Sequence, residues 1–180
     1  MTINSDSEYI HGGVPRTDMK RLDVPERRVL DFSVNLNFFG PPPIIEESWP
    51  ELFETIEQYP SVNGDGVARY YQSTCGVFPH NFLAGNGSTE LIYLAARVLG
   101  YRRAAIITPS FHDYERASLL AGAQVIRCPL PPRNDFALPP EEEMVEIMKN
   151  ADALWIARPN NPTGNLFEKS VVLELADRFP

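Results

Sequence analysis

Two short polar loops carry the side chains that are best suited to chemistry. Residues 85–90 read Gly-Asn-Gly-Ser-Thr-Glu, and residues 160–164 read Asn-Asn-Pro-Thr-Gly. In the first loop the glycines let a ligand come close to the backbone, and free amides at the start of the following helix attract an anion. We interpret this loop as a candidate phosphate-binding loop, with a plain turn and a Ser or Thr helix cap as the alternative.

The second loop holds a polar side chain on a restricted backbone. Asn161 precedes Pro162, which disfavours the helical conformation at Asn161, and a cis peptide bond between them is compatible with this sequence. The Asn161 amide can both donate and accept hydrogen bonds. A rigid Asn-Pro turn without function is the alternative, but two such loops in one parallel sheet favour a shared ligand site.

Several classes of function are disfavoured. Glu90 stands where a dinucleotide loop has its last glycine, and no Gly-Lys-Ser follows, so ATP and NAD are weak candidates. A net charge of −8 argues against nucleic acid or an anionic membrane as the partner. Cys75 and Cys128 are too few for a disulfide framework, and no His, Cys and carboxylate cluster suggests a metal site. We expect a cytoplasmic protein without a membrane span.

The elements that position the two loops alternate between strands and helices. We expect strands at residues 82–84, 104–108, 124–130 and 153–157, and helices at residues 44–57, 67–75, 90–99, 112–121, 141–149 and 168–179. This alternation predicts an α/β fold with a parallel-rich sheet flanked by helices. Residues 30–37 alternate apolar and polar side chains, which is typical of a short strand or extended segment.

The two loops together resemble those of the pyridoxal-phosphate enzymes of the aspartate-aminotransferase fold, class I/II. Residues 161–164 match the Asn-Pro-x-Gly signature of that family, and residues 85–90 are similar to its cofactor-phosphate loop. Within the family, residues 11–13, 31–37 and 85–90 favour the threonine-phosphate decarboxylases of cobalamin biosynthesis over the histidinol-phosphate aminotransferases. The resemblance covers only the N-terminal half of the fold.

The resemblance implies how the cofactor, pyridoxal 5'-phosphate, would be held. Gly87, Ser88 and Thr89 would bind its phosphate. Phe111 would stack on its ring, and Asn161 would bond its 3-oxygen. An aromatic face against a pyridine ring contributes about 0.5–1.5 kcal/mol beyond burial, although a core aromatic is the alternative for Phe111.

The same resemblance implies residues for the substrate and for a partner subunit. Asn35 and Asn161 would line the substrate side, and His11 would approach a phosphate on the substrate. Tyr59 would reach the phosphate of the cofactor in a second subunit, which implies a homodimer. The substrate would be a small amino acid that carries a phosphate.

The family's Schiff-base lysine lies after its Asn-Pro-x-Gly segment. Lys20, Lys149 and Lys169 do not match its context, so we expect that lysine to be absent from these 180 residues and the chain alone to be inactive. The resemblance divides the chain into an N-terminal arm with part of a small domain, residues 1–45, and an incomplete cofactor-binding large domain, residues 46–180. The interpretation is a decarboxylase or an aminotransferase, with a non-catalytic binding or assembly module as the alternative.

Overall fold

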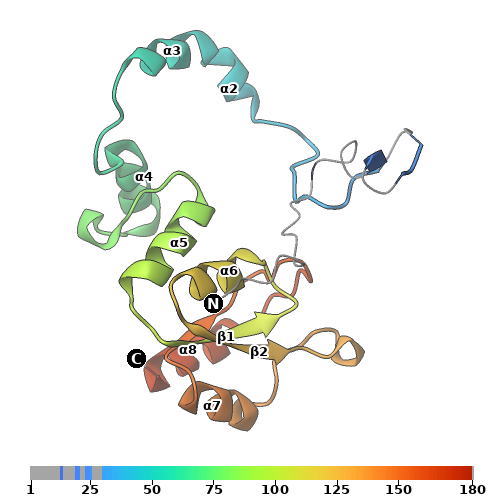
Figure 1. The fold of residues 1–180 in the computed structure, drawn as a ribbon. Helices are drawn as coiled ribbons and strands as arrows, with labels where there is room; N and C mark the ends of the chain where they lie inside the picture. The colour runs from blue at the N-terminus through green and yellow to red at the C-terminus, as the bar shows by residue number, and fades with distance from the viewer. Residues whose placement is uncertain (1–12, 14–18, 21–22, 26–29, 180) are drawn as a thin grey trace. The chain divides into compact units, whose positions relative to one another are not determined.

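The computed structural model describes residues 13, 19–20, 23–25 and 30–179. The chain divides into two units, Met1–Ser61 and Val62–Pro180 (Figure 1). Each unit is a separate body, and the two candidate loops both belong to the second.

The first unit contains short helices and no buried side chain among its described residues. Its elements are α2 (Pro43–Glu47), α3 (Trp49–Glu54) and the 3-10 turn η1 (Thr55–Glu57). The single helix predicted over residues 44–57 was wrong, because Pro50 cannot donate to the carbonyl of Glu46 and its ring collides with that group. The strand alternative for residues 30–37 was also wrong, since the described residues there pair with no other strand.

The second unit is built on a parallel sheet, as the alternation predicted. Its three strands lie in the order β2-β1-β3. The strands are β1 (Arg103–Thr108), β2 (Gln124–Pro129) and β3 (Ala153–Trp155). Ile106, near the middle of the sheet, stands opposite Arg127 on one side and Trp155 on the other. The strand predicted over residues 82–84 was wrong, because within the described residues no strand lies beside it to complete its hydrogen bonds.

The helices of this unit begin and end close to the predicted residues. The predicted ones are α4 (Asp65–Cys75), α5 (Ser88–Val98), α6 (Asp113–Leu120), α7 (Glu141–Lys149) and α8 (Lys169–Arg178). The 3-10 helices η2 (Pro79–Asn81) and η3 (Pro132–Asn134) were not predicted. Helix α4 ends at Gly76, whose φ of 68° allows the left-handed cap that glycine favours. Helix α7 has the predicted bounds, and its first turn carries three glutamates that the helix dipole stabilises.

Helices cover both faces of the sheet, and alternate residues of β1 enter two separate cores. Ala104 packs in a cluster with residues of α5 and α6, whereas Ala105 and Ile107 pack in a cluster with residues of α7 and α8. Figure 1 shows α6 and α7 on opposite sides of the strands. The chain therefore leaves β1 toward one face and β3 toward the other, and the carboxyl ends of strands with this topology are where α/β proteins usually bind ligands.

The side-chain carboxylate of Asp152 joins the amino ends of β1 and β3. Asp152 accepts hydrogen bonds from the backbone amides of Arg102 and Arg103 and from the Arg103 guanidinium, the last at 2.8 Å. The side-chain hydrogen bond from Arg103 lowers the pKa of Asp152 below its usual value, and the backbone amides act in the same direction. These contacts fix the register in which the amino ends of β1 and β3 lie side by side, with Ala104 opposite Ala153.

Candidate functional site

The candidate phosphate loop forms the N-terminal end of α5, and its two glycines have different structural reasons. Gly87 is the helix N-cap with a φ of 85°, a conformation that other residues rarely adopt. A Cβ at Gly85 would lie 2.7 Å from Cδ2 of Leu91, so the turn packs closely on its own helix. A Cβ at Gly87 would meet nothing within 4 Å, which leaves open space beside the helix end.

The first turn of α5 has backbone amides that find no acceptor among the residues that the structure describes. Within the described residues, neither Ser88 nor Thr89 caps the helix with its hydroxyl, so the plain-cap alternative is not what the structure has. Glu90 instead turns back, and its carboxylate accepts a hydrogen bond from the amide of Asn86. The remaining first-turn N–H groups and the positive end of the helix dipole face open space, an arrangement that binds anions.

Phe111 follows β1 and is braced by other aromatic rings. It is half-buried, and its ring makes an edge contact with Tyr114, with centroids 5.8 Å apart and planes at 85°. Tyr114 in turn stacks on Trp155 of β3 at 5.0 Å and 14°. Burial raises the pKa of the Tyr114 hydroxyl above its usual value, which keeps this ring neutral. Phe111 is therefore held in place while part of it remains exposed.

Asn160 joins the loop after β3 to the loop after β1. Its Nδ2 donates to the carbonyl of Pro109 at 3.0 Å and to Oγ1 of Thr163 at 2.9 Å, and the residue is only 2% exposed. Its Oδ1 is buried without a hydrogen-bond partner in the described part of the chain. Asn160 thus fixes the second polar loop beside the segment that carries Phe111.

Asn161, next to this bridge, keeps its amide free. It is half-buried, and its side chain makes no hydrogen bond to any described residue. The peptide bond between Asn161 and Pro162 is cis, one of the two forms that the sequence left open. The side-chain amide of Asn161 therefore lies at the same end of the sheet as the ring of Phe111, without a hydrogen-bond partner among the described residues.

A second buried bond joins α5 to α6. Tyr93 donates through its hydroxyl to Oδ1 of Asp113 at 2.9 Å, and Asp113 is 1% exposed. Through this bond and the Asn160 bridge, the two polar loops and the segment that carries Phe111 are tied together in one unit. Sequence reasoning missed Asn160, Tyr93 and Asp113, since their positions show no spacing that separates them from ordinary helix and turn residues.

The other predicted site residues are not part of this arrangement. Asn35 and Tyr59 belong to the first unit, and both side chains are exposed. His11 lies outside the described residues. The roles expected of these three residues remain predictions.

The three lysines lie at exposed positions. Lys149 forms an ion pair with Glu146 on the outer face of α7, and Lys20 and Lys169 are exposed. The Cys128 thiol is buried, and burial raises its pKa, so it stays protonated near neutral pH. None of these groups is placed as a nucleophile would be.

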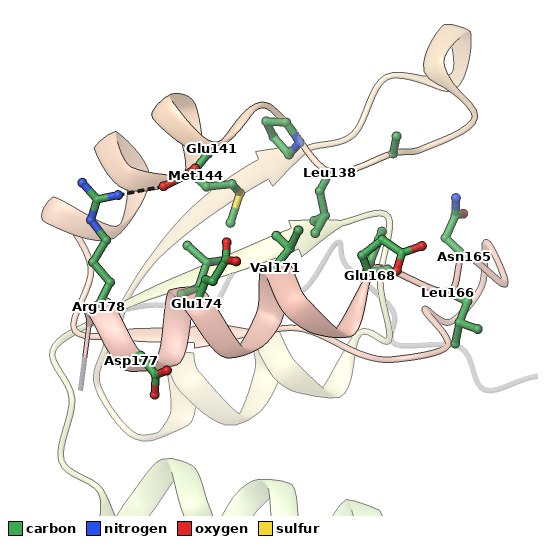
Figure 2. Close-up of a pocket in the computed structure, with 14 residues that line it drawn as sticks. Leu138, Glu141, Met144, Asn165, Leu166, Glu168, Val171, Glu174, Asp177 and Arg178 are labelled. Carbon is green, nitrogen blue, oxygen red and sulfur yellow. Dashed lines mark hydrogen bonds and ion pairs between the residues drawn. The ribbon is translucent and has the colours of Figure 1, made fainter.

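A cavity of about 730 Å³ lies between α7 and α8, on the other face of the sheet (Figure 2). Leu138, Met144 and Val171 point into it, and at its edge Arg178 donates to Glu141 at 2.8 Å. None of its lining residues belongs to either polar loop. The cavity is therefore separate from the site that the motifs predict.

Two further properties concern only the part of the chain that the structure describes. No helix there has the length and apolar character needed to cross a bilayer. No group of three or more His, Cys, Asp or Glu side chains gathers there as metal ligands would.

Comparison with known proteins identifies relatives of this chain. The chain is 33% identical over 172 residues to the threonine-phosphate decarboxylase of Salmonella typhimurium, covering 93% of this chain and 46% of that protein. It is 36% identical over 146 residues to the histidinol-phosphate aminotransferase of Thermococcus gammatolerans, covering 78% and 41%. The chain spans less than half the length of both relatives.

A solved structure shares the fold. The histidinol-phosphate aminotransferase from Clostridium acetobutylicum superposes with a TM-score of 0.69 at 24% identity, over 83% of this chain and 43% of that one. A family model described as aminotransferase class I and II matches residues 27–180, which include both polar loops. The resemblance in the sequence is thereby confirmed, and the chain belongs to the aminotransferase class I and II family.

Proposed function

We propose that this chain holds pyridoxal 5'-phosphate in an enzyme that acts on a phosphate-bearing amino acid. The observation that carries the proposal is the Asn160 bridge, because it places a free amide, Asn161, beside the loop of a braced aromatic ring, Phe111. The family to which the chain belongs supports the choice of cofactor.

The residues fit the three parts of this cofactor. Its phosphate matches the uncapped amides of Gly87, Ser88 and Thr89 and the open space beside Gly87. Phe111 offers a ring for stacking, and the Asn161 amide can donate to the 3-oxygen. When bound, the cofactor withdraws electrons from the substrate's α-carbon, while the protein residues orient it against the strand ends.

For the reaction we propose a threonine-phosphate decarboxylase type, with a histidinol-phosphate type aminotransferase as the alternative. Relatives that carry each of these two names support these two candidate reactions. His11 and Asn35 would then contact the substrate, with the positive charge available to His11 suited to a phosphate. Tyr59 would serve the cofactor of a second subunit in a homodimer, and we place the enzyme in the cytoplasm.

Asn161→Ala should weaken cofactor binding by roughly tenfold, the size of one lost hydrogen bond to a charged oxygen. The ligand is pyridoxine 5'-phosphate, which keeps the ring and the phosphate but has no aldehyde to react with lysines. Quenching of Trp155 fluorescence reports binding. The background is Trp49→Phe, because the chain has two tryptophans.

Asn81→Ala is the matched control for this measurement. Asn81 is an exposed asparagine whose side chain makes no hydrogen bond within the described residues, so binding should stay within about twofold. Absence of binding by the chain with Asn161 intact would contradict the proposed function. Equal losses in both variants would contradict the role of Asn161.

The lysines give a second expected result. We expect treatment with pyridoxal 5'-phosphate and borohydride to modify Lys20, Lys149 and Lys169 to similar extents, because each is an exposed amine. Peptide mass spectrometry locates the adducts. The contrary result would be an adduct at a single lysine that is no longer formed in the Asn161→Ala variant. It would show that this chain carries its own Schiff-base lysine.

A further inference from the structure

Asp113 is a buried carboxylate that is only partly satisfied. It is 1% exposed, and its Oδ2 has no hydrogen-bond partner within the described residues, while Oδ1 accepts from Tyr93 at 2.9 Å. His112 lies beside it, with Nε2 3.7 Å from Oδ1. Burying a polar atom without a partner disfavours the folded state. The first turn of α6 favours a carboxylate, but burying Oδ2 without a partner opposes that gain, which points to a second role for Asp113.

The two ends of the Tyr93–Asp113 bond lie close to the two groups proposed to grip the cofactor. Tyr93 is in the second turn of α5, the helix whose first turn begins at Ser88. Asp113 begins α6 and is two positions after Phe111. Because helices are stiff over such short lengths, the bond fixes the first turn of α5 relative to the Phe111 ring.

We propose that the Tyr93–Asp113 hydrogen bond is a spacer between the phosphate-binding turn and the ring-binding aromatic, and that both are positioning residues for the cofactor. The inference rests on the proposed function. A rigid ligand that carries both a ring and a phosphate binds best when the two subsites are held at its own length. A ligand that carries one group alone gains nothing from this spacing.

The structure supplies variants that separate spacing from folding. Tyr93→Phe removes the donor, and Asp113→Leu removes the acceptor while filling its place with apolar atoms, a replacement that buried charged groups often tolerate. Asp113→Asn keeps an oxygen that can accept from Tyr93 and serves as the rescue. Tyr70→Phe, at an exposed tyrosine of α4, is the matched control.

Each variant is titrated with three ligands: pyridoxine 5'-phosphate, pyridoxine and inorganic phosphate. Trp155 quenching in the Trp49→Phe background follows the first two, and phosphorus NMR follows the third. We expect Tyr93→Phe and Asp113→Leu each to weaken pyridoxine 5'-phosphate binding about tenfold, with the two single-group ligands within about twofold. Asp113→Asn and Tyr70→Phe should bind like the parent.

The double variant Tyr93→Phe/Asp113→Leu tests whether both residues act through the one bond. Its affinity for pyridoxine 5'-phosphate should match that of the weaker single variant, since the bond is already absent in each. Circular dichroism confirms that every variant is folded before titration.

Three results would overturn the inference. Unchanged binding of pyridoxine 5'-phosphate in both single variants would show that the spacing does not depend on this bond. Parallel losses for all three ligands would show that the bond only stabilises the fold. If the parent chain binds no pyridoxine 5'-phosphate, the proposed function is contradicted, and the inference with it. If the parent chain binds this ligand and the variants bind it equally well, only the inference is contradicted.

Discussion

Replacing Asn160 with alanine should lower the free energy of unfolding of the second unit by about 2–4 kcal/mol. The substitution removes two donated hydrogen bonds, which are partly buried, and leaves the Pro109 carbonyl and the Thr163 hydroxyl without this donor. It also deletes the contact that holds the Asn161 loop beside Phe111. Cofactor affinity should therefore fall together with stability.

Urea unfolding followed by Trp155 fluorescence measures the first effect, again in the Trp49→Phe background. The matched control is Asn150→Ala, because Asn150 also donates through Nδ2 to a backbone carbonyl, that of Glu146, but is exposed. The control should cost less than about 1 kcal/mol. Equal costs for the two variants would show that the bridge is not what joins the loops.

The second large effect is expected at the centre of the sheet. Ile107→Ala should lower the free energy of unfolding by about 2–5 kcal/mol, the range for removing a large aliphatic side chain from a filled core. Ile107 is 0% exposed in β1 and packs in the cluster with Met144 of α7 and Leu175 of α8. The close packing around it leaves a cavity that its neighbours cannot fill without moving.

A graded series separates the core effect from a general loss of apolar surface. Ile107→Val removes one methylene and should cost about 0.5–1.5 kcal/mol. Leu120→Ala, at a residue that is 59% exposed at the end of α6, should cost less than about 1 kcal/mol. A cost at Ile107 no larger than that at Leu120 would mean that β1 does not form the centre of this unit.

Local patterns were sufficient to predict the elements that carry strong periodicity. The helix over residues 141–149 has the predicted bounds because apolar residues recur along one face, and its start and end have favourable charges. The strand at 104–108 was found from a short run of apolar residues, and the structure adds Arg103 to it. These signals lie within a few residues of one another and need no knowledge of the rest of the chain.

Predictions failed where an element depends on a distant partner. Residues 82–84 have strand-like composition, but a strand exists only when another strand completes its hydrogen bonds. The single helix predicted over residues 44–57 failed for a different and local reason, because the ring of Pro50 interrupts it and α3 begins anew at Trp49.

The sequence by itself determined the α/β alternation, the glycines that the α5 turn requires, and the two polar loops that mark the family. Tertiary structure alone decided which polar groups meet: Asn160 with Pro109, and Tyr93 with Asp113. The physical reason is that backbone conformation follows from near neighbours in the chain. A buried hydrogen bond, in contrast, joins residues that only the packed sheet and helices bring within 3 Å.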